Sequence, residues 1–400
     1  MKKSLLLTAM MAAAMTASAQ TDFKVALLDS LPVSAITNYA KATNRTAYGY
    51  GDKLYLNDRA AQQLRVFNLA TKEEIGQVDI GANQATGHDE AGNAIVGNWG
   101  FGGSNAAGKK TTFTLISADL SKTVKTNEVT YVTGRCDFLG KAKGNVFGSE
   151  GATLLASGAA EDLEQTGIPC FTFSGGDEPT VETSHVWDPD NKIGGGSWAT
   201  YNYYKDADGK DHYVFVNRQN PLTDFTFTEG EVDEEQLYSP EDRTPNKGVC
   251  NGGEIFVLGS RKFIVYGNNS APTYLDGFTI AEIGSDNTLT TVYTKAANTT
   301  LSREMTTQGN WLNVEVLNDK QAKLYQYFVG GYAAEYGIAI DGAETPVVTG
   351  VKGIENTAAK AVSTMYYTPA GVANKTAVKG LNIVVTKYAD GTQKVVKVIK

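Results

Sequence analysis

The stretch GDKLYLNDRAAQQLRVFNLATKEEIGQVDI, residues 51–80, holds three short runs of apolar and β-branched residues separated by polar turns. The first run follows Gly51-Asp52, the second covers Leu64–Leu69, and the third ends at Ile80. Runs of this length, bounded by Gly, Asn and Asp, predict β-strands. The same order returns at residues 92–116 and 253–266, and helical periodicity is nearly absent, so the sequence predicts an all-β protein.

An aromatic residue marks one strand of each repeat. The markers are Phe67, Phe113, Phe171, Phe225, Phe278 and Tyr325. Consecutive markers are 46 to 58 residues apart by subtraction. Four-stranded units that repeat at about 40 to 50 residues are typical of β-propellers, whose blades bury one another's apolar faces. We therefore predict a β-propeller over residues 20–345, with six blades, or seven as the alternative count. A pair of β-sandwich domains is the alternative architecture.

The composition excludes several classes of protein. The chain has 400 residues, with 36 Lys and Arg against 44 Asp and Glu, and a net charge of −8. Binding to nucleic acid needs clustered basic residues, which the sequence lacks, so we expect no nucleic-acid partner. With 42% hydrophobic and 20% charged residues the chain can bury a large core, which excludes a disordered chain and a charged coiled coil.

The N-terminus has the pattern of a signal peptide. Lys2 and Lys3 precede an apolar stretch from Leu5 to Ala17, and Ala17-Ser18-Ala19 forms a cleavage pattern before Gln20. The apolar stretch is too short to span about 30 Å of hydrocarbon, so we expect no transmembrane segment. Residues 1–19 are thus predicted to be a signal peptide, and the protein to be exported to the periplasm, the outer cell surface or the medium.

Cys136, Cys170 and Cys250 form no C-x-x-C pair, and their odd number leaves at least one thiol unpaired in an exported chain. A disulfide between Cys136 and Cys170 is one interpretation. The alternative is three buried thiols that pack as small apolar side chains.

The character of the chain changes after residue 345. Residues 346–364 are predicted to be a linker, and residues 365–400 a small C-terminal β module. Within this module the turn at Asp390-Gly391, followed by alternating apolar and basic residues, predicts a closing hairpin.

This module resembles a known sorting domain. The run Tyr367-Thr368-Pro369-Ala370-Gly371, the strand Lys379–Val384 and the terminal Lys397–Lys400 resemble the C-terminal sorting module of secreted Bacteroidetes proteins, the Por or type IX secretion family. The resemblance implies that the tail contacts secretion or surface-attachment machinery. The main domain resembles, in strand pattern and Gly-Asn-Trp runs, the propeller-like proteins of unknown function that such bacteria export.

Three of the four tryptophans follow a glycine and a small polar residue, at Trp99, Trp198 and Trp311. Aromatic faces beside polar side chains suit sugar rings, which stack through their C–H faces. The candidate ligand-binding residues are Trp99, Phe101, Trp198, Tyr201, Tyr203, Arg218 and Trp311. We therefore expect a binding or interaction protein whose propeller takes a glycan or a protein ligand at one mouth. The alternative is that the tryptophans fill the space between blades.

One segment suggests a metal ion. Asp206, Asp208 and Asp211 surround Gly209 with alternating carboxylates, a pattern that suits Ca²⁺, although the bidentate Glu of an EF-hand is missing. A polar hairpin turn is the alternative interpretation. We expect no other cofactor.

No catalytic motif stands out. His88, His185 and His212 lie in no metal-binding motif, and no G-x-S-x-G is present. A carbohydrate-active enzyme with paired carboxylates is the alternative function, and its candidate acids are Asp89, Glu90 and Asp137. A structural cell-surface protein is the third interpretation. We expect a binding protein rather than an enzyme.

Overall fold

The computed structural model of the chain describes residues 22–39, 46–82, 84–98, 109–131, 136, 138–156, 167–188, 193, 199–216, 222–240, 252–267, 276–297, 310–347, 361–368, 372–388 and 393–399. The chain divides into two compact units, Met1–Val348 and Thr349–Lys400. We call them the propeller unit and the C-terminal unit.

The described residues of the propeller unit form six four-stranded antiparallel sheets, numbered here as blades 1 to 6. Blade 1 is β2 (Ala47–Tyr50), β3 (Lys53–Asp58), β4 (Gln63–Asn68) and β5 (Glu74–Asp79), and blade 2 is β6 (Gln84–His88), β7 (Ala94–Asn98), β9 (Phe113–Ile116) and β10 (Thr123–Lys125). Blade 3 is β12 (Lys143–Gly144), β13 (Ala152–Leu155), β14 (Ile168–Phe173) and β15 (Val181–Val186), and blade 4 is β16 (Thr200–Lys205), β17 (Asp211–Val216), β18 (Leu222–Thr228) and β19 (Glu231–Tyr238). Blade 5 is β20 (Gly253–Leu258), β21 (Arg261–Gly267), β22 (Phe278–Ile283) and β23 (Leu289–Lys295), and blade 6 is β24 (Asn310–Asn318), β25 (Gln321–Phe328), β26 (Tyr332–Ala339) and β1 (Lys24–Pro32). A two-stranded ribbon of β8 (Lys109–Thr111) and β11 (Val129–Tyr131) and a short 3-10 helix, η1 (Val33–Ala35), complete the elements described in this unit.

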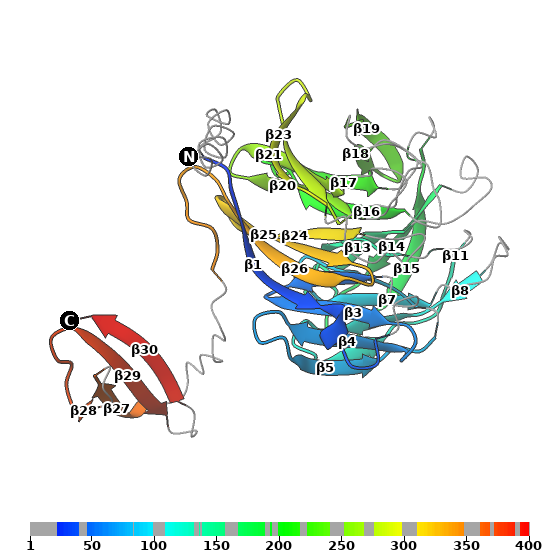
Figure 1. Cartoon of the computed structure of the whole chain (residues 1–400). Coiled ribbons are helices and arrows are strands. Elements are labelled where there is room, and N and C mark those ends of the chain that lie inside the picture. Colours follow the sequence, from blue (N-terminus) through cyan, green and yellow to red (C-terminus); the bar gives the residue numbers. More distant parts are fainter. Residues whose placement is uncertain are drawn as a thin grey trace. The chain divides into compact units, whose positions relative to one another are not determined.

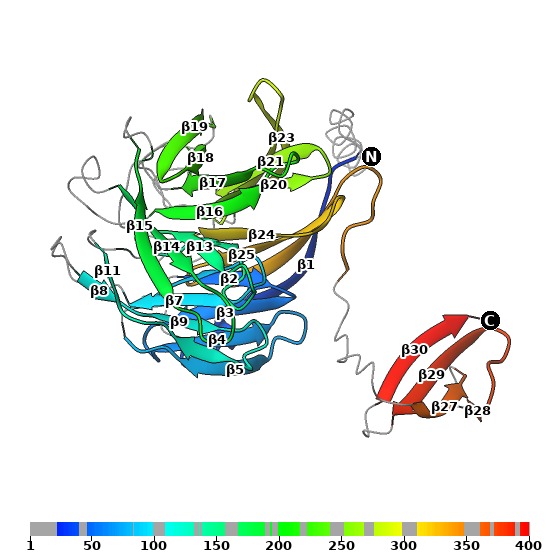
Figure 2. The same cartoon turned by 180° about the vertical axis from the view of Figure 1, so that it is seen from behind.

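Blade 6 joins the two ends of the propeller unit. Its outermost strand, β1, comes from the N-terminal side and pairs antiparallel with β26, from Lys24 opposite Ala339 to Pro32 opposite Tyr332. Figures 1 and 2 show β1, in blue, beside β26, in orange. The chain is thus an all-β propeller, as the sequence predicts; the blade count of the whole chain stays a prediction.

The aromatic markers of the sequence occupy equivalent places in the blades. Five of them lie in the third strand of successive sheets, and the sixth lies in the second strand of blade 6. They are Phe67 in β4, Phe113 in β9, Phe171 in β14, Phe225 in β18, Phe278 in β22 and Tyr325 in β25. All six are buried. Their rings pack between neighbouring blades: Phe113 and Phe171 meet edge to face with centroids 5.0 Å apart. Each apolar face is therefore removed from water by the next blade.

Neighbouring blades are joined by hydrogen bonds near their inner strands. The links are Asn57 Nδ2 to Thr86 Oγ1 at 2.8 Å, Ala142 N to His88 O at 2.7 Å, Lys141 N to Asn202 Oδ1 at 2.9 Å, Asn202 Nδ2 to Gly253 O at 2.8 Å, Val314 N to Glu254 Oε2 at 3.0 Å, and Asn313 Nδ2 to Gly49 O at 2.8 Å. Every boundary between the six sheets has at least one such link. A side chain at Gly140 would bring its Cβ to 2.0 Å from Tyr201 O, so this close approach of backbones requires glycine.

The C-terminal unit is a four-stranded sheet in the order β28-β27-β29-β30. Its strands are β27 (Ala361–Tyr367), β28 (Ala373–Asn374), β29 (Leu381–Tyr388) and β30 (Gln393–Ile399). The last two pair as an antiparallel hairpin, from Leu381 opposite Ile399 to Lys387 opposite Gln393. β27 begins at Ala361, inside the range that we assigned to the linker.

Two cysteines are buried in the propeller unit as separate thiols, Cys136 and Cys170. Cys136 Sγ donates to Phe138 O at 3.0 Å. This arrangement favours the interpretation of small buried side chains over a disulfide between the two. Cys250 lies outside the described residues.

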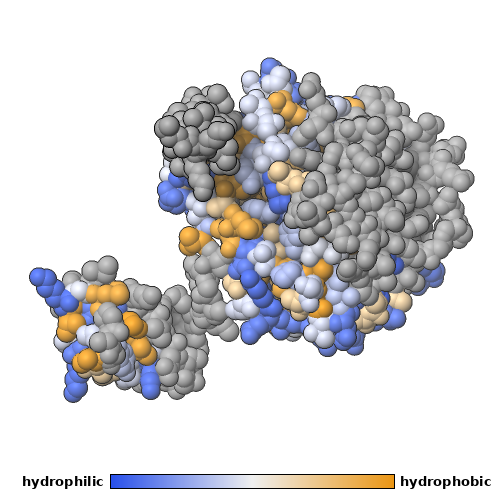
Figure 3. Space-filling model, in the orientation of Figure 1, coloured by the Kyte–Doolittle hydropathy of each residue, from blue (hydrophilic) through white to orange (hydrophobic). Residues whose placement is uncertain are grey.

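Polar and apolar residues are mixed on the propeller face in view in Figure 3. The exposed large apolar side chains include Leu27 on β1 and Val316 and Leu317 on β24. Nowhere in the described ranges does a helix reach the length and apolar character of a membrane span.

Candidate functional site

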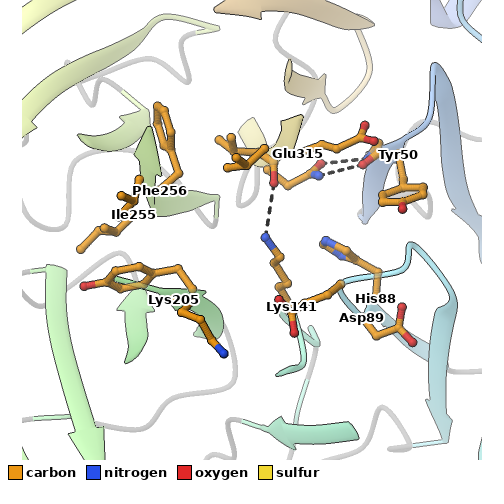
Figure 4. A pocket seen from close by; sticks show the side chains of 15 residues that line it. Tyr50, His88, Asp89, Lys141, Lys205, Ile255, Phe256 and Glu315 are labelled. Carbon is orange, nitrogen blue, oxygen red and sulfur yellow. Dashed lines mark hydrogen bonds between the residues drawn. The ribbon is translucent and has the colours of Figure 1, made fainter. Parts of the chain in front are cut away.

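A cavity of about 280 Å³, which we call the larger cavity, lies among the innermost segments of the blades (Figure 4). Its lining residues are Gly49, Tyr50, His88, Asp89, Glu90, Lys141, Tyr204, Lys205, Ile255, Phe256, Val257, Asn313, Val314, Glu315 and Val316. All six blades contribute, through β2, the end of β6, the segment before β12, β16, β20 and β24. The larger cavity therefore lies on the central axis of the propeller.

A smaller cavity of about 30 Å³ lies next to it. Its lining includes Tyr48, Asn202, Glu254 and Trp311, and it shares His88 and Asn313 with the larger cavity. A volume of about 30 Å³ suffices for one water molecule and little more.

Lys141 brings a positive charge into the larger cavity. Its backbone is held on both sides, because its N–H donates to Asn202 Oδ1 at 2.9 Å and its carbonyl accepts from Tyr203 N at 3.0 Å. Its Nζ donates to Val314 O at 3.4 Å, a long bond, and Figure 4 shows the side chain pointing into the space between the blades. Within the described ranges Lys141 forms no ion pair at 4.0 Å or less.

Glu254 is an acid enclosed by the propeller. Its side chain is 2% exposed, and its Oε2 accepts from Val314 N at 3.0 Å. Its Oε1 has no hydrogen-bond partner among the described residues. Burial raises the pKa of Glu254 to about 7, against the opposing effect of the positive charge of Lys141. Glu254 can therefore hold or release a proton near neutral pH.

His88 contributes a neutral ring to both cavities. The imidazole stacks on Tyr48 with centroids 4.5 Å apart, and Tyr48 stacks on Tyr55 at 4.6 Å. Burial, with the nearby charge of Lys141, lowers the pKa of His88 to about 3. At neutral pH the imidazole is uncharged, so it packs on Tyr48 as a neutral ring and does not pair with a carboxylate.

The three carboxylates that line the larger cavity are fixed by the protein itself. Asp89 is fully buried, and its oxygens accept the backbone N–H groups of Ala91, Asn93 and Val146 at 2.8–2.9 Å. It therefore holds the loop after β6 in shape.

Glu90 and Glu315 lie nearer to solvent, the first exposed and the second partly exposed. Glu90 Oε2 accepts from Gly144 N at 2.6 Å, and Glu315 Oε2 accepts from Gly51 N at 3.0 Å and from Tyr325 Oη at 2.8 Å. Each of the two carboxylates is thus held in place at the solvent side of the cavity. Asp137, the third acid predicted for the enzyme interpretation, lies outside the described residues.

None of the described aromatics that were predicted to bind a ligand lines the larger cavity, although Trp311 lines the smaller one. Tyr201, Tyr203 and Trp311 are 1%, 2% and 7% exposed. The ring of Tyr201 packs on Phe215, and that of Trp311 on Phe138, with centroids 5.2 and 4.5 Å apart. All three rings are buried, which for Trp311 agrees with our alternative interpretation of a tryptophan between blades, and ligand binding by these residues stays a prediction. Trp99, Phe101, Trp198 and Arg218 lie outside the described residues.

The predicted calcium segment is a tight hairpin turn between β16 and β17. Asp206 Oδ1 accepts from the backbone N–H groups of Asp208 and Lys210, at 3.0 and 2.7 Å. Asp211 pairs with Lys143 and with Lys205. In the parts of the chain that the structure describes, no group of three or more His, Cys, Asp or Glu side chains is placed to hold a metal ion. The arrangement agrees with a polar turn, and Ca²⁺ binding stays a prediction.

A polar cluster between blades 4 and 5 has no signal in the sequence. Asp224 is buried and accepts from Tyr204 Oη at 2.6 Å and Lys262 Nζ at 2.7 Å, while His212 Nδ1 lies 3.0 Å from its Oδ1. Burial raises the pKa of Asp224, but the bonds from His212, Lys262 and Tyr204 outweigh it, so the pKa lies below its usual value. The cluster joins two blades and is remote from the lining of the larger cavity except at Tyr204.

Comparisons with known proteins give structural likeness alone. No protein-family model matches the chain, and no curated protein matches it in sequence. A DUF4623 family protein from Bacteroides eggerthii is similar in structure over 77% of this chain and 73% of its own, with 10% identity and a TM-score of 0.49.

Two further solved structures are similar. A neuraminidase-like protein of A/little yellow-shouldered bat/Guatemala matches over 79% of this chain and 100% of its own, with 10% identity and a TM-score of 0.45. A β-propeller domain from Myceliophteria thermophila matches over 93% and 100%, with 9% identity and a TM-score of 0.38. These likenesses concern the fold and not what the proteins bind or catalyse. The resemblance of the C-terminal unit to a sorting module stays a prediction.

Proposed function

We propose that this protein is an exported binding protein that takes one sugar residue of a glycan in the larger cavity. The observation that carries the proposal is the lining of that cavity, which combines the ring of Tyr50 and the apolar side chain of Val257 with the polar groups of Lys141, Glu90 and Glu315. Sugars have apolar C–H faces and polar edges, so they need both kinds of surface.

The size of the cavity supports a small ligand unit. Pockets for drug-sized ligands measure about 300 to 1,000 Å³, and the larger cavity lies just below that range at about 280 Å³. Export rests on residues 2–19, and attachment to the cell surface rests on the resemblance of residues 365–400 to a sorting module.

Binding is favoured over catalysis by the positions of the acids. Glycoside hydrolysis needs two carboxyl groups that flank the scissile bond. Glu254 has a pKa that suits a general acid, but it lines only the smaller cavity. Asp89 is buried and saturated by backbone N–H groups, which leaves it no oxygen for a substrate proton.

A thermal-stability screen tests the proposal. Ligand that binds only the folded state raises the midpoint, and at a concentration of 100 times Kd it adds about 2.7 kcal/mol of stability. We expect one class of sugar to raise the midpoint of the wild type, and Tyr50→Ala to abolish the shift. Tyr367→Ala, in the C-terminal unit, is the matched control and should keep it. A panel of neutral and acidic sugars that leaves the wild-type midpoint unchanged would contradict the proposed function.

A further inference from the structure

The class of sugar follows from Lys141, on the condition that the proposed function is correct. An ammonium group has three N–H donors, and Lys141 uses one of them in a bond of 3.4 Å to Val314 O. Two donors therefore remain for a ligand. No carboxylate of the described chain lies within 4.0 Å to neutralise the charge.

The position of Lys141 places its charge at the end of the larger cavity that lies next to the smaller one. We call this the inner end. Lys141 pairs with His88 in a parallel β-bridge, and His88 lines both cavities. The two backbone hydrogen bonds of Lys141 to blade 4 fix the point from which its side chain enters the cavity. Such a fixed donor loses little freedom when a ligand binds, which favours affinity.

The other charges of the cavity select among ligands. A cationic ligand would be repelled by Lys141 at the inner end. A phosphate monoester carries close to two negative charges at neutral pH and would meet Lys141 together with Glu90, Glu315 and the nearby Glu254. The other ammonium of the lining, that of Lys205, already lies 3.7 Å from Asp211 Oδ1. A single carboxylate matches the lining ammonium of Lys141, which has no carboxylate partner among the described residues, and hydroxyl groups can donate to the carboxylates at the solvent side.

We propose that the ligand is an acidic sugar with one carboxylate, which pairs with the Lys141 ammonium while the sugar hydroxyls donate to Glu90 and Glu315. The carboxylate thus enters first, toward His88, and the rest of the glycan extends toward solvent. In this orientation the cavity recognises a terminal sugar residue of the glycan rather than an internal one.

Calorimetric titration of the full chain with D-glucuronate and with D-glucose tests this inference, because the two sugars differ only in the carboxylate. We expect glucuronate to bind at least about tenfold more tightly than glucose. Lys141→Met should remove this preference, and Lys141→Arg should retain most of it. Lys210→Met, in an exposed turn, is the control and should change nothing. Equal affinity for the two sugars, or a preference that survives Lys141→Met in a folded variant, overturns the role of Lys141 and leaves the proposed function standing.

A thermal-stability measurement with a simpler ligand distinguishes a failure of this inference from a failure of the proposed function. If neither sugar binds, sodium acetate is used as the probe of the ammonium alone. A midpoint shift with acetate that is lost in Lys141→Met would support Lys141 as a carboxylate site and refute the glycan. No response to acetate or to either sugar would refute both.

Discussion

The buried carboxyl group of Glu254 makes the stability of the propeller unit depend on pH in a calculable way. We consider the substitution Glu254→Gln, which keeps an oxygen for the Val314 N–H but cannot ionise. In the wild type the folded state holds the proton up to a pH of about 7, whereas the usual pKa of this group is 4.5.

The sign of the effect follows from proton counting. Between pH 4.5 and 7 the unfolded chain binds fewer protons at this site than the folded chain, so the free energy of unfolding falls as the pH rises through this window. Each pH unit of separation corresponds to about 1.4 kcal/mol. The wild type should therefore lose about 3 kcal/mol between pH 4 and pH 8 through Glu254, and the glutamine variant should not lose this amount.

Urea denaturation at several pH values, followed by tryptophan fluorescence, measures the difference. All four tryptophans, Trp99, Trp187, Trp198 and Trp311, precede residue 349, so the signal reports the propeller unit. The free energy of unfolding of Glu254→Gln minus that of the wild type should rise by about 3 kcal/mol from pH 4 to pH 8. This change is expected whether the variant is more or less stable than the wild type at pH 4. An exposed substitution, Glu178→Gln, is the control. A difference that stays constant within about 0.5 kcal/mol across this range would refute the reasoning.

Three further predictions concern the joints of the ring. Asn313→Ala removes both bonds to the backbone of Gly49 and leaves buried groups unpaired, so it should cost about 1 to 3 kcal/mol in urea denaturation, whereas Asn318→Ala on an exposed turn should cost less than about 0.5 kcal/mol. Asp224→Ala leaves the partly buried Lys262 without its carboxylate and removes one of the two carboxylates beside His212, so it should cost about 3 to 5 kcal/mol, while Asp208→Ala should be nearly neutral; equal midpoints for the two would contradict the assigned cluster. Deletion of β1 exposes the full edge of β26 and should produce soluble aggregates in size-exclusion chromatography, and a monomer of unchanged midpoint would show that β1 does not close the ring.

The blades could be predicted because the residues that define each blade are close together in the sequence. A turn of Gly and Asp, an apolar run and an aromatic residue in the third strand recur in one blade after another, and Phe67 and Phe113 stand in equivalent strands although 46 positions separate them. The marker Tyr325 stands one strand earlier, in the second strand of blade 6, and this blade takes its fourth strand from the other end of the chain. Spacing alone could not show that exchange.

Asp89 and Glu90, two of the candidate acids of the enzyme interpretation, line the larger cavity. The other cavity residues could not be predicted, since each depends on partners from other blades. Lys141 stands in an irregular segment before a strand of only two residues, and nothing in its local sequence sets it on the axis. Glu254 is the second residue of the otherwise apolar run Gly253–Leu258, and an acid at that position is the signal that the sequence offers. An aromatic after a glycine suits a ligand site and an interface between blades equally well, so the sequence alone leaves both open; Trp311 is buried, and Trp99 and Trp198 lie outside the described residues.

The pairing of β1 with β26 also determines when this protein can finish folding. Lys24 and its partner Ala339 are 315 positions apart along the chain, the difference of their numbers. A chain made from its N-terminus presents β1 long before β26 exists, and contacts of such separation form late because the intervening chain must be ordered first. During that interval β1 is an unpaired strand, open to pairing with other chains. The irregular register between Leu27 and Asp29, with Pro32 at its end, makes β1 a poor partner for strands other than its own, which protects the unfinished ring until its last blade arrives.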